Sequence, residues 1–289
     1  PLLAAIGHPL AADQRAFEER YCQGHWRESG GVRHWQALGA SHLEELQRLT
    51  RPLLLHRRKG DCLDLPPKQR RLVPVALSEA EGQGFQHRLQ LTVDDYRRRA
   101  AEGLVRRDAE VLAVFTALRQ IAAEYKLPAA AELIGGLLRQ GEPVVVFSTF
   151  VAAAQLLQQR LGGALLTGRL RPAERQGLAE AFQAGVHPLL ICTYGAGGLG
   201  FNLQRARHVV LLERPWTPGD AEQAEDRCHR IGQRSPLQTH WLQLGVADQL
   251  VDGLIASKAE RIALLLQRRP TALERQGLPR MVRRLLEEW

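Results

Sequence analysis

The sequence of 289 residues contains few cysteines and no long hydrophobic run. The four cysteines, Cys22, Cys62, Cys192 and Cys228, are far apart and form no CxxC pair or Cys/His cluster with metal-ligand spacing. A disulfide framework and a zinc site therefore have no support. No apolar run approaches the roughly twenty residues that span a bilayer, and no signal peptide opens the chain. We therefore expect a protein of a reducing compartment that is neither secreted nor inserted in a membrane.

Internal repeats and low-complexity segments are also absent, and hydrophobic residues make up 45% of the chain, enough to bury a core. Lysine and arginine total 39 against 31 aspartates and glutamates, which gives a formal net charge of +8. This balance is compatible with binding to nucleic acid, and equally with a basic protein that is merely soluble. The chain opens on Pro1 in the middle of a pattern, so we expect it to be a fragment of a longer protein.

The N-terminal part of the sequence has a helical pattern. From Pro9 to about Thr50, aromatic and leucine side chains recur three or four positions apart, and Gly30-Gly31 divides this stretch into two expected helices. A Pro-Pro turn then leads into a strand predicted from Leu72 to Leu77. For the basic residues before this strand, a solvated strand edge is favoured over phosphate binding. These residues are Lys68, Arg70 and Arg71.

A polar helical segment follows from Ser78 to about Tyr125, and Pro128 is expected to open a further helix that runs to Arg139. From Val144 to about Leu244 the pattern changes, because short apolar runs alternate with helical runs. Strands that are apolar throughout are typical of a parallel sheet covered by helices on both faces, so we predict the α/β class. The strand runs are VVVF, ALLT, PLLICT, HVVLLE and QTHWLQL, and the helical ones are Val151–Leu161, Pro172–Ala184 and a stretch from Pro218.

The stretch Gly195–Gly200 matches the G-x-G-x-x-G pattern of dinucleotide-binding folds. The context does not fit, because only Phe201 to Arg207 separate the last glycine from the next strand, too few for a helix that crosses a sheet. The acidic residue Glu213 also comes too early. These glycines either let backbone N–H groups approach a ribose, a phosphate or a nucleic-acid backbone, or form a tight turn that needs positive φ.

The tetrapeptide Thr217–Asp220 has the composition of a helix start, with a hydroxyl N-cap, a proline at the first position and an early carboxylate. Within the helix predicted from there, Gln223, Arg227 and Arg230 are spaced i, i+4 and i+7 and would share one face. This stripe is either a ladder of surface ion pairs with neighbouring carboxylates such as Asp226, or a polyphosphate site that acts in trans. The glycine loop at the edge of the sheet favours the second interpretation.

The run QAEDRCHRIGQ, preceded by RPWTPG and by TYGAGGLGFNL, resembles motifs V and VI of the second RecA-like lobe in the Swi/Snf family of helicase superfamily two. Other pieces agree in order: DLPPK after a basic stretch, VVVFSTF in the place of motif IV, and LLTGRLRPAERQGLAEAFQAG after it. The likeness extends from Arg51 to about Leu266. WTPGDAEQAEDRCHRIGQ and THWLQLGVADQLVDGLIASK also resemble the annealing-helicase branch of this family.

The resemblance implies a RecA-like three-layer parallel sheet of the P-loop NTPase type that lacks the Walker A loop, with a helical insertion and a helical N-terminal segment. It divides the chain into four parts. Residues 1–62 are expected to be the end of lobe one and the linker, and residues 63–127 the start of lobe two with its helical protrusion. Residues 128–267 are expected to be the RecA-like C-terminal lobe, and residues 268–289 a basic helix or tail.

The same resemblance implies site residues, position by position. Arg227 and Arg230 resemble the arginine fingers of motif VI, and Gln223 resembles its orienting glutamine. The residues implied on the nucleotide side are Gly198, Gly200, Asn202 and Asp226. The positions implied to contact DNA phosphates are Ser148, Thr149, Thr167, Thr193 and Trp216. A second interpretation of these hydroxyls is that they cap the loops they begin.

The sequence contains no G-x-x-x-x-G-K-[ST] loop and no DExH acid pair, so nothing in it cradles the β- and γ-phosphates or holds Mg²⁺. We therefore expect ATP and Mg²⁺ to be bound mainly by a missing lobe one, and no metal by this chain alone. The expected function is the second motor lobe of an ATP-dependent double-stranded DNA translocase or remodeller, inactive as a fragment. Its expected partners are double-stranded or branched DNA and the missing lobe, in the cytoplasm or the nucleus. The alternative is a non-catalytic DNA- or protein-binding module.

Overall fold

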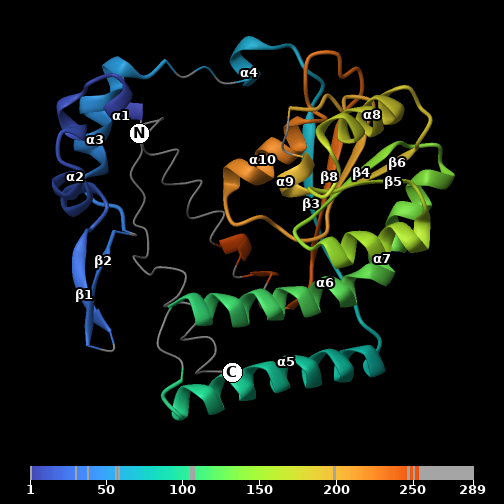
Figure 1. The fold of residues 1–289 in the computed structure, drawn as a ribbon. Helices are drawn as coiled ribbons and strands as arrows, with labels where there is room; N and C mark the ends of the chain where they lie inside the picture. Colours follow the sequence, from blue (N-terminus) through green and yellow to red (C-terminus); the bar gives the residue numbers. More distant parts are fainter. Residues whose placement is uncertain are drawn as a thin grey trace. The chain divides into compact units, whose positions relative to one another are not determined.

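Six parallel strands form one sheet in the order β3-β8-β7-β4-β6-β5 (Figure 1). Every residue of β4 and of β6 is buried, as strands covered on both faces require. The predicted α/β class is therefore confirmed, and all the predicted strand runs from 144 to 244 are present. The strands are β3 (Lys68–Pro74), β4 (Val144–Ser148), β5 (Ala164–Leu166), β6 (Leu189–Thr193), β7 (His208–Leu211) and β8 (Leu237–Gln243).

A computed structural model describes residues 2–29, 31–37, 39–55, 57, 59–104, 108–197, 200–245, 248–249 and 251–253. The chain divides into two compact units. Unit one holds residues 1–57, 93–115 and 257–289, and unit two, which contains the sheet, holds residues 58–92 and 116–256. The predicted tail at 268–289 lies outside the described residues. None of the described helices is both long and apolar enough to cross a membrane.

Helices lie on both faces of the sheet (Figure 1). On one face, α6 (Asp108–Arg139) and α7 (Val151–Leu161) pack in one buried cluster with alternate residues of β4, such as Val144 and Val146. Because successive side chains of a strand point to opposite faces, the apolar run of β4 supplies the core on both sides. The helices of the other face are α8 (Pro172–Gln183), α9 (Tyr194–Gly197) and α10 (Pro218–Asp226).

The helices α5 (Glu79–Ala101) and α6 precede β4 and form the helical insertion. The rings of Phe85 and Tyr125 meet between them with centroids 5.2 Å apart. The sequence predicts a new helix at Pro128, but α6 passes through Pro128. This prediction is wrong because α6 is buried on both sides of the proline, as at Leu127, and this burial offsets the hydrogen bond that proline removes.

Strand β3 begins at Lys68, earlier than the strand predicted from Leu72 to Leu77, and it ends at Pro74. It pairs with β8 in parallel register from its first residue to its last. The partner strand is about 170 positions away, so a local pattern cannot show where pairing starts. Lys68 and Arg70 consequently lie within the edge strand and not before it.

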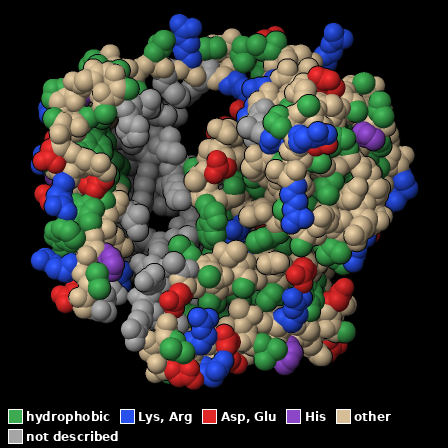
Figure 2. Space-filling view, viewed as in Figure 1, with side chains coloured by type: hydrophobic (Ala, Val, Ile, Leu, Met, Phe, Trp, Pro, Cys, Tyr) green, Lys and Arg blue, Asp and Glu red, His purple; other side chains and the backbone are tan. Residues whose placement is uncertain are grey.

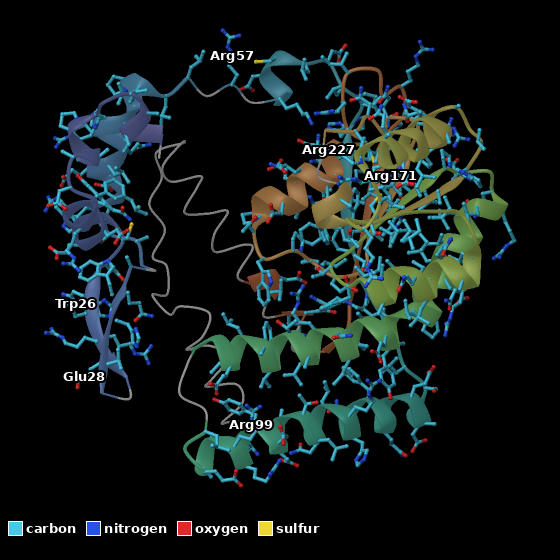
Figure 3. All side chains as sticks on the ribbon, in the orientation of Figure 1. Trp26, Glu28, Arg57, Arg99, Arg171 and Arg227 are labelled. Atoms are coloured by element: carbon cyan, nitrogen blue, oxygen red, sulfur yellow. The ribbon has the colours of Figure 1, made fainter. Side chains whose placement is uncertain are left out.

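Unit one contains a β-hairpin where the sequence pattern predicts helix. Strands β1 (His25–Ser29) and β2 (Val32–Gln36) pair antiparallel, and Trp26, which is labelled in Figure 3, is the register partner of Trp35. The two rings meet edge to face at 5.5 Å, and Gly31 has a φ of +75°, which suits a hairpin turn. The two expected helices flank this hairpin, but the residues next to the glycines form strands because the tryptophans pack across them.

The remaining elements of the N-terminal part are short. In unit one they are α1 (Leu2–Ala5), the 3-10 turn η1 (Pro9–Ala11), α2 (Gln14–Tyr21), α3 (Leu43–Thr50) and the 3-10 turn η2 (Arg51–Leu53). In unit two, α4 (Lys59–Cys62) precedes β3.

Candidate functional site

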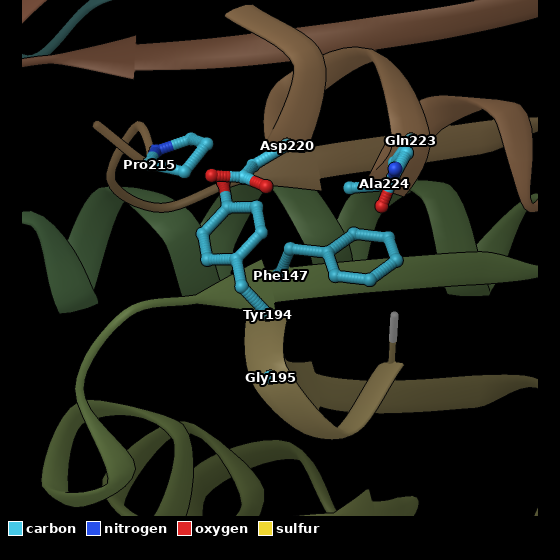
Figure 4. Close-up of a pocket in the computed structure, with 7 residues that line it drawn as sticks. All are labelled: Phe147, Tyr194, Gly195, Pro215, Asp220, Gln223 and Ala224. Atoms are coloured by element: carbon cyan, nitrogen blue, oxygen red, sulfur yellow. The ribbon is translucent and has the colours of Figure 1, made fainter. Parts of the chain in front are cut away.

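The carboxyl ends of β4, β6 and β7 meet at one edge of the sheet. The chain leaves β4 toward α7 on one face, and it leaves β6 and β7 toward α9 and α10 on the other (Figure 1). Neighbouring strands whose connections run to opposite faces leave a crevice, which is where open α/β sheets bind ligands. A cavity of about 210 Å³ lies there. It is lined by Phe147, Tyr194, Gly195, Pro215, Asp220, Gln223 and Ala224 (Figure 4).

The cavity has an aromatic floor and a polar mouth. Phe147 is buried, and its ring stacks on Tyr194 with centroids 5.6 Å apart. The Tyr194 hydroxyl donates to the carbonyl of Glu213 at 2.6 Å. Burial and the nearby Glu213 carboxylate raise the pKa of Tyr194 well above its usual value, so this hydroxyl stays protonated. Asp220 and Gln223 of α10 are exposed and supply the polar side (Figure 4).

The start of α10 agrees with the prediction. Thr217 has an extended backbone, and its hydroxyl accepts a hydrogen bond from the amide of Asp220 at 3.1 Å. Pro218 occupies the first helical turn, where its missing N–H has no helical partner in any case. Ala221 and Ala224 are buried, which leaves Gln223 on the exposed side of the helix.

The end of α10 differs from the prediction, because the helix stops at Asp226. Residues 227–232, which we call the arginine turn, form turns and bends, beginning with Arg227 (Figure 3). The carbonyl of Arg227 accepts from the amide of Leu203 at 2.9 Å, a bond to the loop that follows the glycine string in place of a bond within the helix. The predicted stripe of Gln223, Arg227 and Arg230 on one helical face is therefore wrong.

Arg230 contacts the loop that follows the glycine string. Its Nη1 donates to the carbonyl of Gly200 at 3.2 Å and to Oδ1 of Asn202 at 2.7 Å. Burial, followed by the positive charge of Arg230, lowers the pKa of Arg227. The fold thus brings together predicted residues of both motifs, although not through a helical stripe. Gly198 lies outside the described residues.

Glu225 belongs to α10, and its carboxylate is fully buried. It accepts hydrogen bonds from Arg70 of β3 at 2.6 Å and from the indole N–H of Trp241 at 3.0 Å. Lys68 adds an ion pair at 3.1 Å. The predicted strand edge is confirmed, because β3 is the edge strand and Arg70 and Arg71 are exposed, but Lys68 and Arg70 also supply the charged partners that a buried carboxylate requires.

Asp226, predicted on the nucleotide side, is engaged by two lysines. Its carboxylate pairs with Lys59 at 2.8 Å and with Lys68 at 3.1 Å. Burial acts to raise the pKa of this carboxyl, but the hydrogen bond from Lys59 and the charge of Lys68 outweigh it and hold the pKa below its usual value. Asp226 therefore anchors the beginning of the arginine turn to β3 and α4, and nothing in the sequence pattern indicates these partners.

Gln233 closes the arginine turn from its other end. Its amide group donates to the carbonyls of Ala206 and Cys228 at 2.8 and 3.1 Å. Its carbonyl accepts from the amides of Arg234 and Ser235 at 2.9 and 3.0 Å. Both donors and both lone pairs of the amide are therefore satisfied, which fixes the turn in one shape. Sequence reasoning did not single out this residue.

The predicted DNA-contacting hydroxyls lie at or just beyond the carboxyl ends of β4, β5 and β6. Ser148 is fully buried, and its hydroxyl donates to the carboxylate of Glu213 at 3.0 Å, so this hydroxyl serves the interior and is not presented to DNA. The amide of Thr149 donates to the same carboxylate at 2.7 Å. Thr167 and Thr193 are nearly buried at the same edge.

Trp216, the last predicted DNA contact, is half-buried against an arginine of the helical insertion. The guanidinium carbon of Arg119 lies 4.4 Å from the Trp216 ring centre, and Arg119 donates to the carbonyl of Arg214. Burial lowers the pKa of Arg119. Further along α6, Lys126 pairs with Asp248 at 2.8 Å inside the protein. The insertion is thus joined to the loop that precedes α10, a link that the sequence does not indicate.

Residues 125–232 match the family model of the helicase conserved C-terminal domain. The DNA annealing helicase and endonuclease ZRANB3 of Bos taurus is 29% identical over 84% of this chain and 23% of its own length. The putative ATP-dependent helicase/translocase YwqA of Bacillus subtilis is 30% identical over 74% of this chain and 26% of its own length. A SWI/SNF-related matrix-associated actin-dependent regulator of chromatin subfamily A-like protein 1, from Xenopus tropicalis, is 31% identical over 84% of this chain. The chain spans about a quarter of the length of these relatives.

Solved structures share the fold. The Sulfolobus solfataricus SWI2/SNF2 ATPase core in complex with dsDNA aligns over 78% of this chain and 52% of that chain, with a TM-score of 0.54 and 23% identity. The parallel sheet, the site at its carboxyl edge and the family model together define the C-terminal, RecA-like lobe of a helicase. The similarity of this chain to its relatives shows further that the chain belongs to the Swi/Snf family.

Proposed function

We propose that this chain is the second motor lobe of an ATP-dependent double-stranded DNA translocase. Arg227 and Arg230 reach the phosphates of an ATP whose phosphate-binding loop and Mg²⁺ belong to a first RecA-like lobe. The observation that carries the proposal is the contact of Arg230 with Gly200 and Asn202. This contact joins the glycine loop to the arginine turn at the edge of the sheet where α/β folds bind ligands.

The electrostatics of the arginine turn support the binding of an anion. The pKa of Arg227 is lowered by burial and by Arg230, because neighbouring positive charges disfavour each other. The nearby carboxylates, Glu225 and Asp226, pair with cations of β3 and α4. A polyphosphate between the guanidinium groups removes their repulsion, and each planar fork can bind two of its oxygens.

The proposed cycle uses closure and reopening of two lobes. ATP binds lobe one, the lobes close, and Arg227 and Arg230 stabilise the charge that develops on the transferring phosphoryl group. Gln223, exposed at the mouth of the cavity, orients the reacting groups. Hydrolysis then reopens the cleft and moves the motor along one strand of duplex DNA.

The DNA side of the proposal uses backbone contacts. Thr149, Thr167 and Thr193 lie at the carboxyl edge, where amides and hydroxyls bind phosphates and set register without reading sequence. Trp216, which is half-buried against Arg119, is the further residue proposed on the DNA side. One relative is named an annealing helicase and one solved relative was determined with dsDNA, which supports double-stranded or branched DNA as the substrate.

Substitution of Arg230 tests the catalytic role. In a protein that contains both lobes, Arg230→Ala should lower DNA-stimulated ATP turnover by about 10³- to 10⁵-fold, the effect of losing an arginine finger. The matched control is Arg160→Ala, which removes an exposed arginine at the end of α7 and should leave turnover unchanged. Turnover of Arg230→Ala close to that of the wild type would contradict the proposal.

The net charge of +8 favours a second candidate, a module that binds DNA or protein without turnover. Figure 2 shows lysines and arginines interspersed with carboxylates over the visible face rather than gathered in one patch. Such a module would bind DNA as the isolated chain, with an affinity that falls steeply as salt rises. Salt-sensitive DNA binding by the isolated chain, together with no DNA-stimulated ATP turnover in the two-lobe protein, would favour this candidate over the motor.

A further inference from the structure

The arginine turn has no regular secondary structure that fixes the direction of its side chains. Because α10 ends at Asp226, helical hydrogen bonds do not continue to Arg230. Burial, followed by the positive charge of Arg230, lowers the pKa of Arg227. The end of α10 supports the first half of the turn, since the amides of Arg227 and His229 donate to the carbonyls of Gln223 and Glu225 at 3.2 and 3.0 Å. Contacts from other elements add to this support.

One lysine provides such support. The ammonium group of Lys59 donates to the carbonyl of His229 at 2.6 Å and pairs with the carboxylate of Asp226 at 2.8 Å. Asp226 directly precedes Arg227, and His229 directly precedes Arg230. An ammonium group has three donors, so it can hold both residues at once. A single side chain thus contacts the residue before each of the two arginines, through the carboxylate of Asp226 and the backbone carbonyl of His229.

The same segment of chain also holds the ring of His229. Its Nε2 lies 2.7 Å from the carbonyl of Pro66. Residues 59–66, which we call the entry segment, lie between residue 57, where the first stretch of unit one ends, and the first strand of the sheet. The entry segment therefore contacts His229 at its backbone and at its side chain.

We propose that Lys59 is a positioning residue for the arginine turn, so that the direction of Arg227 and Arg230 depends on the entry segment. Its consequence for ATP turnover rests on the proposed function, whereas the positioning itself does not. The side chain of Lys59 is 32% exposed, and Lys68 also pairs with Asp226. Removal of Lys59 therefore leaves Asp226 with a partner, and the loss falls on the carbonyl of His229.

Hydrogen exchange of the 289-residue chain tests the positioning. Lys59→Met keeps the length of the side chain and removes the ammonium group. We expect the amides of residues 227–233 to exchange about tenfold faster or more, as the loss of a charged hydrogen bond implies, while those of β4 and β6 and the melting temperature stay unchanged. Arg57→Met, which removes an exposed cation two positions earlier, is the matched control. Unchanged exchange at 227–233 in Lys59→Met would overturn the proposal.

Steady-state kinetics of the two-lobe protein test the consequence. Lys59→Met should lower kcat about 10- to 100-fold with little change in KM for ATP, because a displacement of about 1 Å costs about 10² in rate. Lys59→Arg should restore part of the rate. If Lys59 acts through the arginine turn, its effect should shrink sharply in an Arg230→Ala background, since coupled residues are not additive.

The outcomes separate the two proposals. A large loss of turnover in Arg230→Ala with a normal kcat in Lys59→Met would overturn the role of Lys59 alone. Normal turnover in Arg230→Ala would overturn the proposed function and, with it, the kinetic consequence of Lys59. Fully additive losses in the double variant would show that Lys59 acts on turnover by a route other than the arginine turn.

Discussion

Helix α10 is fixed at its two ends by different parts of the chain. At its start, the hydroxyl of Thr217 bonds to the amide of Asp220, three positions away. At its end, Glu225 and Asp226 bond to residues of β3 and α4 that lie 155 to 170 positions away, as does the carbonyl of His229 just beyond. The start therefore depends on neighbours in sequence, and the end depends on neighbours in the folded sheet.

This difference bears directly on the site. Capping bonds form as soon as the segment becomes helical, so the sequence shows where the helix begins. The bonds at the other end need β3 and α4, which lie beside the end of α10 only in the folded chain. The arginines that we propose for catalysis follow this second end, so their direction is a property of the tertiary structure.

The largest effect is expected at the distant end. Arg70, Lys68 and Trp241 all present donors to the buried carboxylate of Glu225. In Glu225→Gln an N–H group faces one of these donors, and the buried charge is lost. We expect the free energy of unfolding to fall by about 3 kcal/mol, at the low end for a broken buried ion pair because Arg70 is partly exposed. Urea unfolding of the chain measures this loss.

Glu222→Gln is the matched control for that experiment. The Glu222 side chain is 62% exposed and lies 3.8 Å from Lys68, so its removal should change the unfolding free energy by less than about 0.5 kcal/mol. Equal losses in the two variants would mean that the buried network does not hold this end of α10.

A smaller effect is expected at the start of the helix. Thr217→Ala removes the hydroxyl that caps α10 and should lower the unfolding free energy by about 1 kcal/mol. Thr217→Ser keeps the hydroxyl and should be close to the wild type in the same urea titration. A loss in Thr217→Ala as large as that in Glu225→Gln would remove the contrast between the two ends.

The smallest effect is expected from acid. The pKa of Asp226 is held below its unfolded value of about 3.9, so the folded state binds this proton less readily. The ion pairs of Asp226 therefore contribute their full stability above about pH 4. This contribution is lost as the pH falls from about 4 through the lowered pKa of the folded state. We expect the unfolding free energy of Asp226→Asn to decline less steeply below pH 4 than that of the wild type. Parallel declines would contradict this assignment.

The regions that could be predicted are those where one local pattern decides the structure. The run 144–147 of β4 is apolar at every position, as is typical of a strand covered on both faces, and the same holds for residues 189–192 of β6. The predicted helices next to Gly30-Gly31 and the predicted helix start at Pro128 were wrong, because cross-strand packing of tryptophans and burial of a helix on the sheet override local signals.

The candidate site shows the same division. The residues Gly200, Asn202 and Arg230 could be selected from motifs, and the fold brings them into contact. Their predicted arrangement on one helical face was wrong, because residue spacing does not reveal that the carbonyl of Arg227 bonds to Leu203 and the helix stops. The supporting residues Lys59 and Gln233 carry no local signal of their role.

By itself, the sequence determined the α/β class, the strand runs from 144 to 244, the capped start of α10 and the residue types of a Swi/Snf helicase lobe. Only the tertiary structure decided where α10 ends, which cations hold Glu225 and Asp226, and how the arginine turn is supported. The physical reason is the range of the bonds. Periodicity and capping act over a few residues, whereas buried ion pairs join strands and loops that become neighbours only in the folded chain.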